Sequence, residues 1–181
     1  LEDLLGDIQE ARGDNLAAAH AYQAAIELAS NEEKYRLALA VEFMRHSNFD
    51  AARLVLAQAS KLWPTSWRLL LALGMVEHFA GTDEQAEQFL LRAIELAPDP
   101  EIALHYFGEI EVEQAAVPSD AAISQLCAHA DKNTQDGKMQ YYCGAALFRR
   151  EYTAGKKNDS EKIIRRLHTA TTLQPSDAAA H

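Results

Sequence analysis

The sequence predicts an all-α protein built from repeated helix pairs, and three observations lead to this prediction. A period of 34 residues relates Gly6, Ala40, Gly74 and Gly108, and a bulky apolar residue precedes each of them. Within each period the apolar residues recur three and four positions apart, which is the spacing of one helix face. Asp, Asn, Ser, Thr, Gly and Pro gather between the apolar segments, where they can cap one helix or end another. No strand is needed to explain this pattern.

The first three helix pairs follow the period closely. Breaks at Asp14-Asn15, Ser47-Asn48 and Gly81-Thr82-Asp83 separate the two helices of each pair. Polar residues or a proline, as at Pro64 and Pro98, separate one pair from the next. The helices predicted for these pairs are residues 1–13 and 15–29, 33–46 and 49–62, and 67–80 and 83–96.

Two insertions shift the fourth and fifth pairs. Gly144 follows Gly108 by 36 residues rather than 34, which places two extra residues near position 117. Pro175 follows Pro98 by 77 residues, and this leaves seven more between Glu151 and Ser160. We expect this second insertion to form a longer loop or to extend the preceding helix. The helices predicted here are residues 100–114, 119–131, 137–152 and 159–173.

The 34-residue period has the residue types of a known repeat. The third repeat resembles the tetratricopeptide repeat (TPR) at Leu70, Leu73-Gly74, Ala86, Leu90, Ala93 and Pro98. This resemblance implies a right-handed α-solenoid, or superhelix, of about five helix-turn-helix repeats. Small residues at these positions let the two helices of a repeat approach closely. Glu77 and Glu111 depart from the family pattern, which has an aromatic residue at their position.

The resemblance covers nearly the whole chain, so we expect one solenoid domain over residues 1–181. The chain begins at Leu1 without a methionine, and Ser176 to Ala178 resemble the start of another repeat. We therefore expect a fragment of a longer protein. The expected repeats are residues 1–32, 33–66, 67–100, 101–136 and 137–177, with a further repeat beginning at 178–181.

In this family the first helices of the repeats line a concave groove that commonly holds a peptide or a partner helix. The resemblance implies a non-catalytic scaffold with such a groove, whose residues follow from the repeat register. The expected groove residues are Leu37, Val41, Met44, Arg45, Leu71, Met75, Phe79, His105, Tyr141 and Phe148. The alternative for some of them is packing within or between helix pairs.

Two other functions fit the sequence. The chain could be a structural or regulatory arm of a larger enzyme whose catalytic domain lies outside these residues. It could also associate end to end, because residues 1–33 hold eight acids and one arginine, whereas residues 149–166 hold seven basic residues and three acids. The same basic segment could instead dock an acidic partner or form a solvated face.

Composition and motifs exclude several classes of function. The net charge of −10 argues against nucleic-acid binding, and no apolar run approaches the roughly 20 residues that cross a bilayer. The seven histidines show no zinc-protease spacing, and no Walker or GxSxG motif occurs. His105 and Glu109 form an i, i+4 pair, which we interpret as two polar side chains on the surface rather than as a metal or proton-transfer site. We therefore expect no catalytic residues, metal or cofactor, and the sequence gives no indication of compartment.

Cys127 and Cys143 fall on consecutive helices of neighbouring repeats, so a disulfide between them is geometrically feasible. The residues equivalent to Cys143 in other repeats are Leu39, Leu73 and Phe107. This equivalence favours a buried thiol at Cys143.

Overall fold

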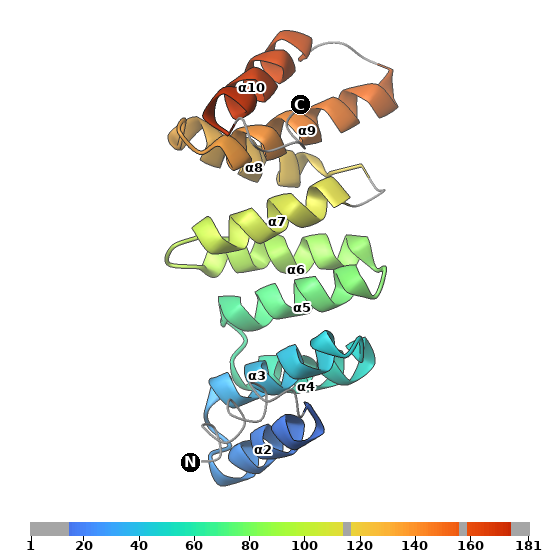
Figure 1. Cartoon of the computed structure of the whole chain (residues 1–181), viewed down its shortest axis with the longest axis vertical. Coiled ribbons are helices and arrows are strands. Elements are labelled where there is room, and N and C mark those ends of the chain that lie inside the picture. Colours follow the sequence, from blue (N-terminus) through green and yellow to red (C-terminus); the bar gives the residue numbers. More distant parts are fainter. Residues whose placement is uncertain (1–14, 114–116, 156–158, 175–181) are drawn as a thin grey trace. The chain divides into compact units, whose positions relative to one another are not determined.

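The structure is a computed structural model that describes residues 15–113, 117–155 and 159–174. Within these ranges the chain forms nine α-helices and no strand (Figure 1). The helices are α2 (Asn15–Leu28), α3 (Glu33–Arg45), α4 (Phe49–Leu62), α5 (Trp67–Phe79), α6 (Asp83–Leu96), α7 (Glu101–Glu113), α8 (Asp120–Lys132), α9 (Gly137–Ala154) and α10 (Ser160–Leu173). The helix predicted for residues 1–13 lies outside the described residues.

The nine described helices confirm the predicted ones, and several boundaries are fixed by side-chain caps. Asn48 accepts a hydrogen bond from the backbone N–H of Ala51 at the start of α4, and Ser66 accepts one from Leu69 at the start of α5. These contacts satisfy amide groups that the first turn of a helix leaves unpaired. Thr82 stands at the same place before α6, but its side chain does not cap that helix.

The insertion after Glu151 extends α9, which is one of the two outcomes expected from the sequence. α9 continues to Ala154 and ends at Gly155, whose φ of 63° is the left-handed conformation that favours glycine at helix ends. The backbone N–H of Gly155 bonds back to Tyr152, which completes the cap.

Contacts divide the chain into an N-terminal unit, Leu1–Pro98, and a C-terminal unit, Asp99–His181. In the N-terminal unit each helix from α2 to α6 packs on the next, and α3 also contacts α5 (Figure 1). In the C-terminal unit α8 packs on α7 and α9, α10 packs on α9, and α7 contacts α9. Each unit therefore has the packing of stacked helix pairs, in which the first helices of neighbouring repeats meet.

The periodic small residues are the points of closest helix approach. A side chain added at Gly74 would place its Cβ 2.5 Å from Cγ of Leu90, and both residues are buried. Gly108 is covered in the same way by the ring of Tyr142. Ala52 and Ala86, which share one position of the repeat, are fully buried. This explains why the period appears most clearly at glycine and alanine.

An ion pair replaces the aromatic residue of the family pattern at Glu77. The Glu77 side chain on α5 is only 3% exposed, and Arg53 on α4 donates to both of its carboxylate oxygens at 2.7 and 2.9 Å. The hydroxyl of Thr82 donates to the same carboxylate, which explains why Thr82 does not cap α6. These hydrogen bonds, with Arg53 first, outweigh burial and lower the pKa of Glu77. The sequence departure is thus compensated by a partner on the preceding helix.

The structure corrects the expectation of a buried thiol. Cys127 on α8 and Cys143 on α9 form a disulfide, with their Cα atoms 4.9 Å apart. Helix packing brings the two positions together even though the equivalent positions elsewhere hold Leu or Phe. The bridge is buried and joins the fourth repeat to the fifth.

We predict that replacing both Cys127 and Cys143 with serine lowers the free energy of unfolding by about 3 kcal/mol, because the 16-residue separation closes a loop of that size. Urea denaturation followed by circular dichroism measures the difference. A reducing agent should destabilise the wild type and leave the double-serine variant unchanged. Two free thiols in the intact mass of air-oxidised, denatured protein would contradict the bridge.

Candidate peptide-binding surface

In the N-terminal unit the predicted groove residues divide into exposed and buried sets. Val41 on α3 and Phe79 on α5 are 40% and 54% exposed, and the side chain of Arg45 is 51% exposed. Met75 is half-buried. Val41 and Met75 are one period apart, as are Arg45 and Phe79, so equivalent positions on two contacting helices bear these side chains. We refer to Val41, Arg45, Met75 and Phe79 as the α3–α5 face.

Three other predicted groove residues are buried in the apolar core or pack against it. Leu71 is only 9% exposed, so the expectation that it faces a ligand is wrong. Because α5 is apolar around most of its circumference, register alone did not separate its inner and outer positions. Leu37 and Met44 are half-buried against the apolar cluster of the N-terminal unit.

Aromatic contacts fix one end of the α3–α5 face. The ring of Phe79 stacks on the ring of Phe49 at the start of α4, with centroids 5.8 Å apart and planes inclined by 14°. The His78 ring lies tilted against Phe79 at 5.4 Å. Phe49 was not predicted as part of this surface, since the register assigns it to a second helix. Stacking holds Phe79 in one place and leaves half of it open to a ligand.

A buried carboxylate orders the end of α3. Glu42 is 2% exposed, and it contacts Arg45 at 3.6 Å and Nε2 of His46 at 3.1 Å. Arg45 is thereby held beside the apolar side chains, with half of its surface in solvent. The α3–α5 face therefore combines apolar area with one positive charge.

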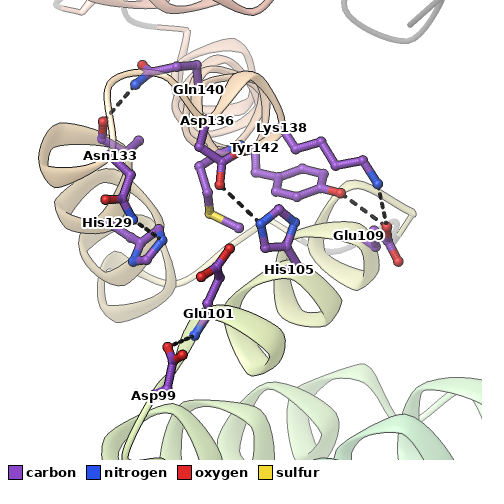
Figure 2. A network of polar contacts seen from close by, with 12 residues as sticks. Asp99, Glu101, His105, Glu109, His129, Asn133, Asp136, Lys138, Gln140 and Tyr142 are labelled. Carbon is purple, nitrogen blue, oxygen red and sulfur yellow. Dashed lines mark hydrogen bonds and ion pairs between the residues drawn. The ribbon is translucent and has the colours of Figure 1, made fainter. Parts of the chain in front are cut away.

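In the C-terminal unit His105 is part of a polar network (Figure 2). Its Nε2 donates to Oδ2 of Asp136 at 3.1 Å, and Oδ1 of Asp136 accepts the backbone N–H of Met139 at 3.0 Å. Asp136 thus caps α9 and joins α9 to α7. The sequence identified His105 but not Asp136, because the two lie 31 residues apart.

Glu109 belongs to the same network without pairing with His105. Its Oε1 accepts hydrogen bonds from the Tyr142 hydroxyl and from Nζ of Lys138, both at 3.3 Å (Figure 2). The His105 ring meets the Tyr142 ring edge-on, with centroids 6.3 Å apart. These contacts tie α7 to α9, so the network positions the two first helices rather than arranging groups around a reactive atom.

The remaining predicted groove residues lie on α9. Tyr141 is half-buried, with its ring tilted against Tyr142. Phe148 is 52% exposed and stacks on Tyr152, which is 79% exposed. Phe148 and Tyr152 also line a pocket of about 450 Å³ with Ile163 and Ile164 of α10. Tyr152 was not among the predicted groove residues because it follows Glu151, where the insertion interrupts the repeat register.

No group of three or more His, Cys, Asp and Glu side chains in the described ranges could hold a metal ion. Among the described helices, none has both the length and the apolar character needed to cross a bilayer.

Comparisons with known proteins identify the repeat family that residues 68–100 match and solved structures with a similar fold. The model of the tetratricopeptide repeat family matches residues 68–100. A solved structure of YrrB, described as a TPR protein with an unusual peptide-binding site, has a TM-score of 0.74 at 20% identity, over 99% of this chain and 88% of that chain. A MamA structure also has a TM-score of 0.74, at 19% identity over 98% of this chain and 92% of that one.

A third solved structure, the APC/C hetero-tetramer Cut9–Hcn1, has a TM-score of 0.63 at 21% identity, over 97% of this chain and 33% of that chain. No curated protein sequence matches this chain. At these identities the similarity establishes the fold, and the repeat signature in residues 68–100 agrees with it. Residues 68–100 match the tetratricopeptide repeat family, and the chain has the fold of tetratricopeptide repeat proteins.

Proposed function

We propose that this chain is a non-catalytic scaffold whose α3–α5 face binds a peptide or an amphipathic helix of a partner protein. The observation that carries the proposal is the exposure of Val41 and Phe79 beside Arg45 on two adjacent first helices. Large apolar side chains gain free energy when a partner covers them.

The composition of the face indicates the class of ligand. Val41, Met75 and Phe79 differ in shape, and methionine adapts to varied apolar partners. Arg45 adds one cation that can pair with a carboxylate. We infer that the ligand presents apolar side chains with an acidic residue next to them, as an amphipathic helix or an extended segment does.

The polar network of the C-terminal unit has a structural role that the His105–Asp136 pair illustrates. His105 and Asp136 form a histidine–carboxylate pair, but Asp136 is also used to cap α9. The description of YrrB as having a peptide-binding site is consistent with the proposal, since the two chains share a fold.

A displayed library of random peptides tests the proposal. Selection on the wild-type chain should enrich apolar peptides with acidic neighbours. The variant Val41→Glu, Phe79→Glu should bind the selected peptides at least about tenfold more weakly, because two apolar contacts are lost and two negative charges are added. Isothermal titration calorimetry measures the affinities.

The matched control is Leu54→Glu with Leu62→Glu, since both leucines lie on the second helix α4 and are 61% and 56% exposed. This control should keep wild-type affinity. Equal affinity of the α3–α5 variant and the wild type, with both folded, would contradict the proposed face.

A further inference from the structure

A pocket of about 480 Å³ opens on other helices, in the C-terminal unit. Asp131 near the end of α8, Gln140 of α9, and Lys162, Arg165 and Arg166 of α10 contribute to its lining. Three cations and one carboxylate thus face the same space. This is unusual in a chain whose net charge is −10.

Arg166 forms the inner wall of this pocket. Its side chain is only 7% exposed; it donates from Nη1 to Oε1 of Gln140 at 2.7 Å and from Nη2 to Asp131. The amide nitrogen of Gln140 donates to the Ala130 carbonyl at 2.7 Å, so this buried amide is also fixed. Nε of Arg166 is buried and has no hydrogen-bond partner within the described ranges. Asp131 balances the charge of Arg166, so the excess positive charge of the pocket lining comes from Lys162 and Arg165.

Three carboxylates around the pocket are paired with other arginines, whereas the exposed Glu161 of α10 has no ion pair among the described residues. Asp131 accepts from Arg166, while Asp120 and Asp159 accept from Arg150 at 3.1 and 2.7 Å. Lys162 and Arg165 are exposed, and the part of the chain that the structure describes holds no ion pair for either. The two cations at the mouth are therefore not held in ion pairs among the described residues, although Asp120, Asp131 and Asp159 line a neighbouring pocket with Lys162.

We propose that this α8–α10 pocket binds the carboxylates of an acidic peptide segment. Lys162 and Arg165 would pair with the incoming carboxylates at the mouth, and Arg166 would form the inner wall. The pocket has room for one or two acidic side chains rather than for a whole helix. The α8–α10 pocket shares no residue with the α3–α5 face. It is a second proposed contact for a polypeptide, and it can be tested independently of the first.

Titration with a capped pentaglutamate peptide, followed by calorimetry and by amide NMR shifts, tests this site at low salt. The variant Lys162→Gln, Arg165→Gln should bind it roughly fivefold to tenfold more weakly, because two exposed ion pairs are lost. Wild-type binding should also weaken as salt rises. Capped pentaglutamine is the control ligand and should not bind. Since pentaglutamate has no apolar side chains, its result is distinguishable from that of the α3–α5 experiment.

The matched control protein is Lys61→Gln, Arg68→Gln, which makes the same charge change at exposed positions of the N-terminal unit. It should keep wild-type affinity for pentaglutamate. Equal weakening in both variants, or no binding by the wild type, would overturn the proposal. Binding of inorganic phosphate without pentaglutamate would identify a free oxyanion site instead. Self-association that is lost in the Lys162→Gln, Arg165→Gln variant, without pentaglutamate binding by the wild type, would overturn the proposal and indicate a second copy of the chain as the occupant.

Discussion

Replacing Arg53 with methionine should lower the free energy of unfolding by about 3 kcal/mol, because it leaves the buried carboxylate of Glu77 without its cation. This value is at the low end of the range for broken buried pairs, since the Arg53 side chain is 34% exposed. Methionine keeps much of the arginine stem, so the loss reports on charge and hydrogen bonding more than on packing. Urea denaturation measures the change.

Two comparisons separate the ion pair from a general effect of losing an arginine. Arg92→Met removes an exposed arginine of α6 and should change stability by less than about 0.5 kcal/mol. Adding Glu77→Leu to Arg53→Met should recover most of the loss, because no buried charge then remains.

The pH dependence of the free energy of unfolding provides an independent check on the Arg53–Glu77 pair. The fold lowers the pKa of Glu77 below its usual value, mainly through Arg53, so the stabilisation is complete above about pH 4.5 and is lost as pH falls through the lowered pKa. The difference between the wild type and Arg53→Met should shrink over that acidic range. A difference that stays constant would assign the effect to packing instead.

Gly108→Val should destabilise the chain by about 3 kcal/mol, because its Cβ would lie 2.1 Å from Cδ2 and 2.5 Å from Cγ of Tyr142. The ring cannot move aside easily, since Tyr142 is 5% exposed and its hydroxyl is bonded to Glu109. Relief of the overlap therefore requires α7 and α9 to separate. Thermal unfolding monitored by circular dichroism measures the loss.

The control is Ala128→Val, which adds the same β-branched side chain at an exposed position of α8. It should cost only the difference in helix propensity, less than about 1 kcal/mol. If Gly108→Val and Ala128→Val were equally stable, the close approach of α7 and α9 would be contradicted.

The helices could be predicted from the sequence because their boundaries depend on local residues. Asn48 and Ser66 are caps that act within three residues of their own position, and the apolar spacing of α4 and α6 needs no distant partner. Gly74 marks a close contact through its place in the period. The same pattern of caps and apolar residues recurs 34 residues later, so each repeat predicts the helix boundaries of the next.

Features that depend on three-dimensional neighbours could not be predicted in this way. The partner of Glu77 is Arg53, 24 residues earlier, and nothing in the repeat pattern links them. The Cys127–Cys143 bridge was feasible from the sequence, but equivalence to Leu and Phe favoured a buried thiol at Cys143 instead. Leu71 was assigned to the surface since register gives the direction of a side chain but not the depth of its helix.

The α8–α10 pocket depends on residues that are visible in the sequence and on pairings that only helix packing creates. The excess of basic residues in 149–166 is visible in the sequence, but a solvated face has the same composition. Burial of Arg166, its contact with Asp131 on α8, and the engagement of Asp120 and Asp159 by Arg150 all come from helix packing. Lys162 and Arg165 stand out only after these pairs are known.

Hydrogen–deuterium exchange of the chain with a library-selected peptide bound would locate the ligand directly. We predict that binding slows exchange in α3 and α5, around Val41 and Phe79, and leaves the exposed face of α4 around Leu54 unchanged. Protection confined to α4 or α6, with no change in α3 and α5, would contradict the proposal that the first helices of the N-terminal unit bind the partner.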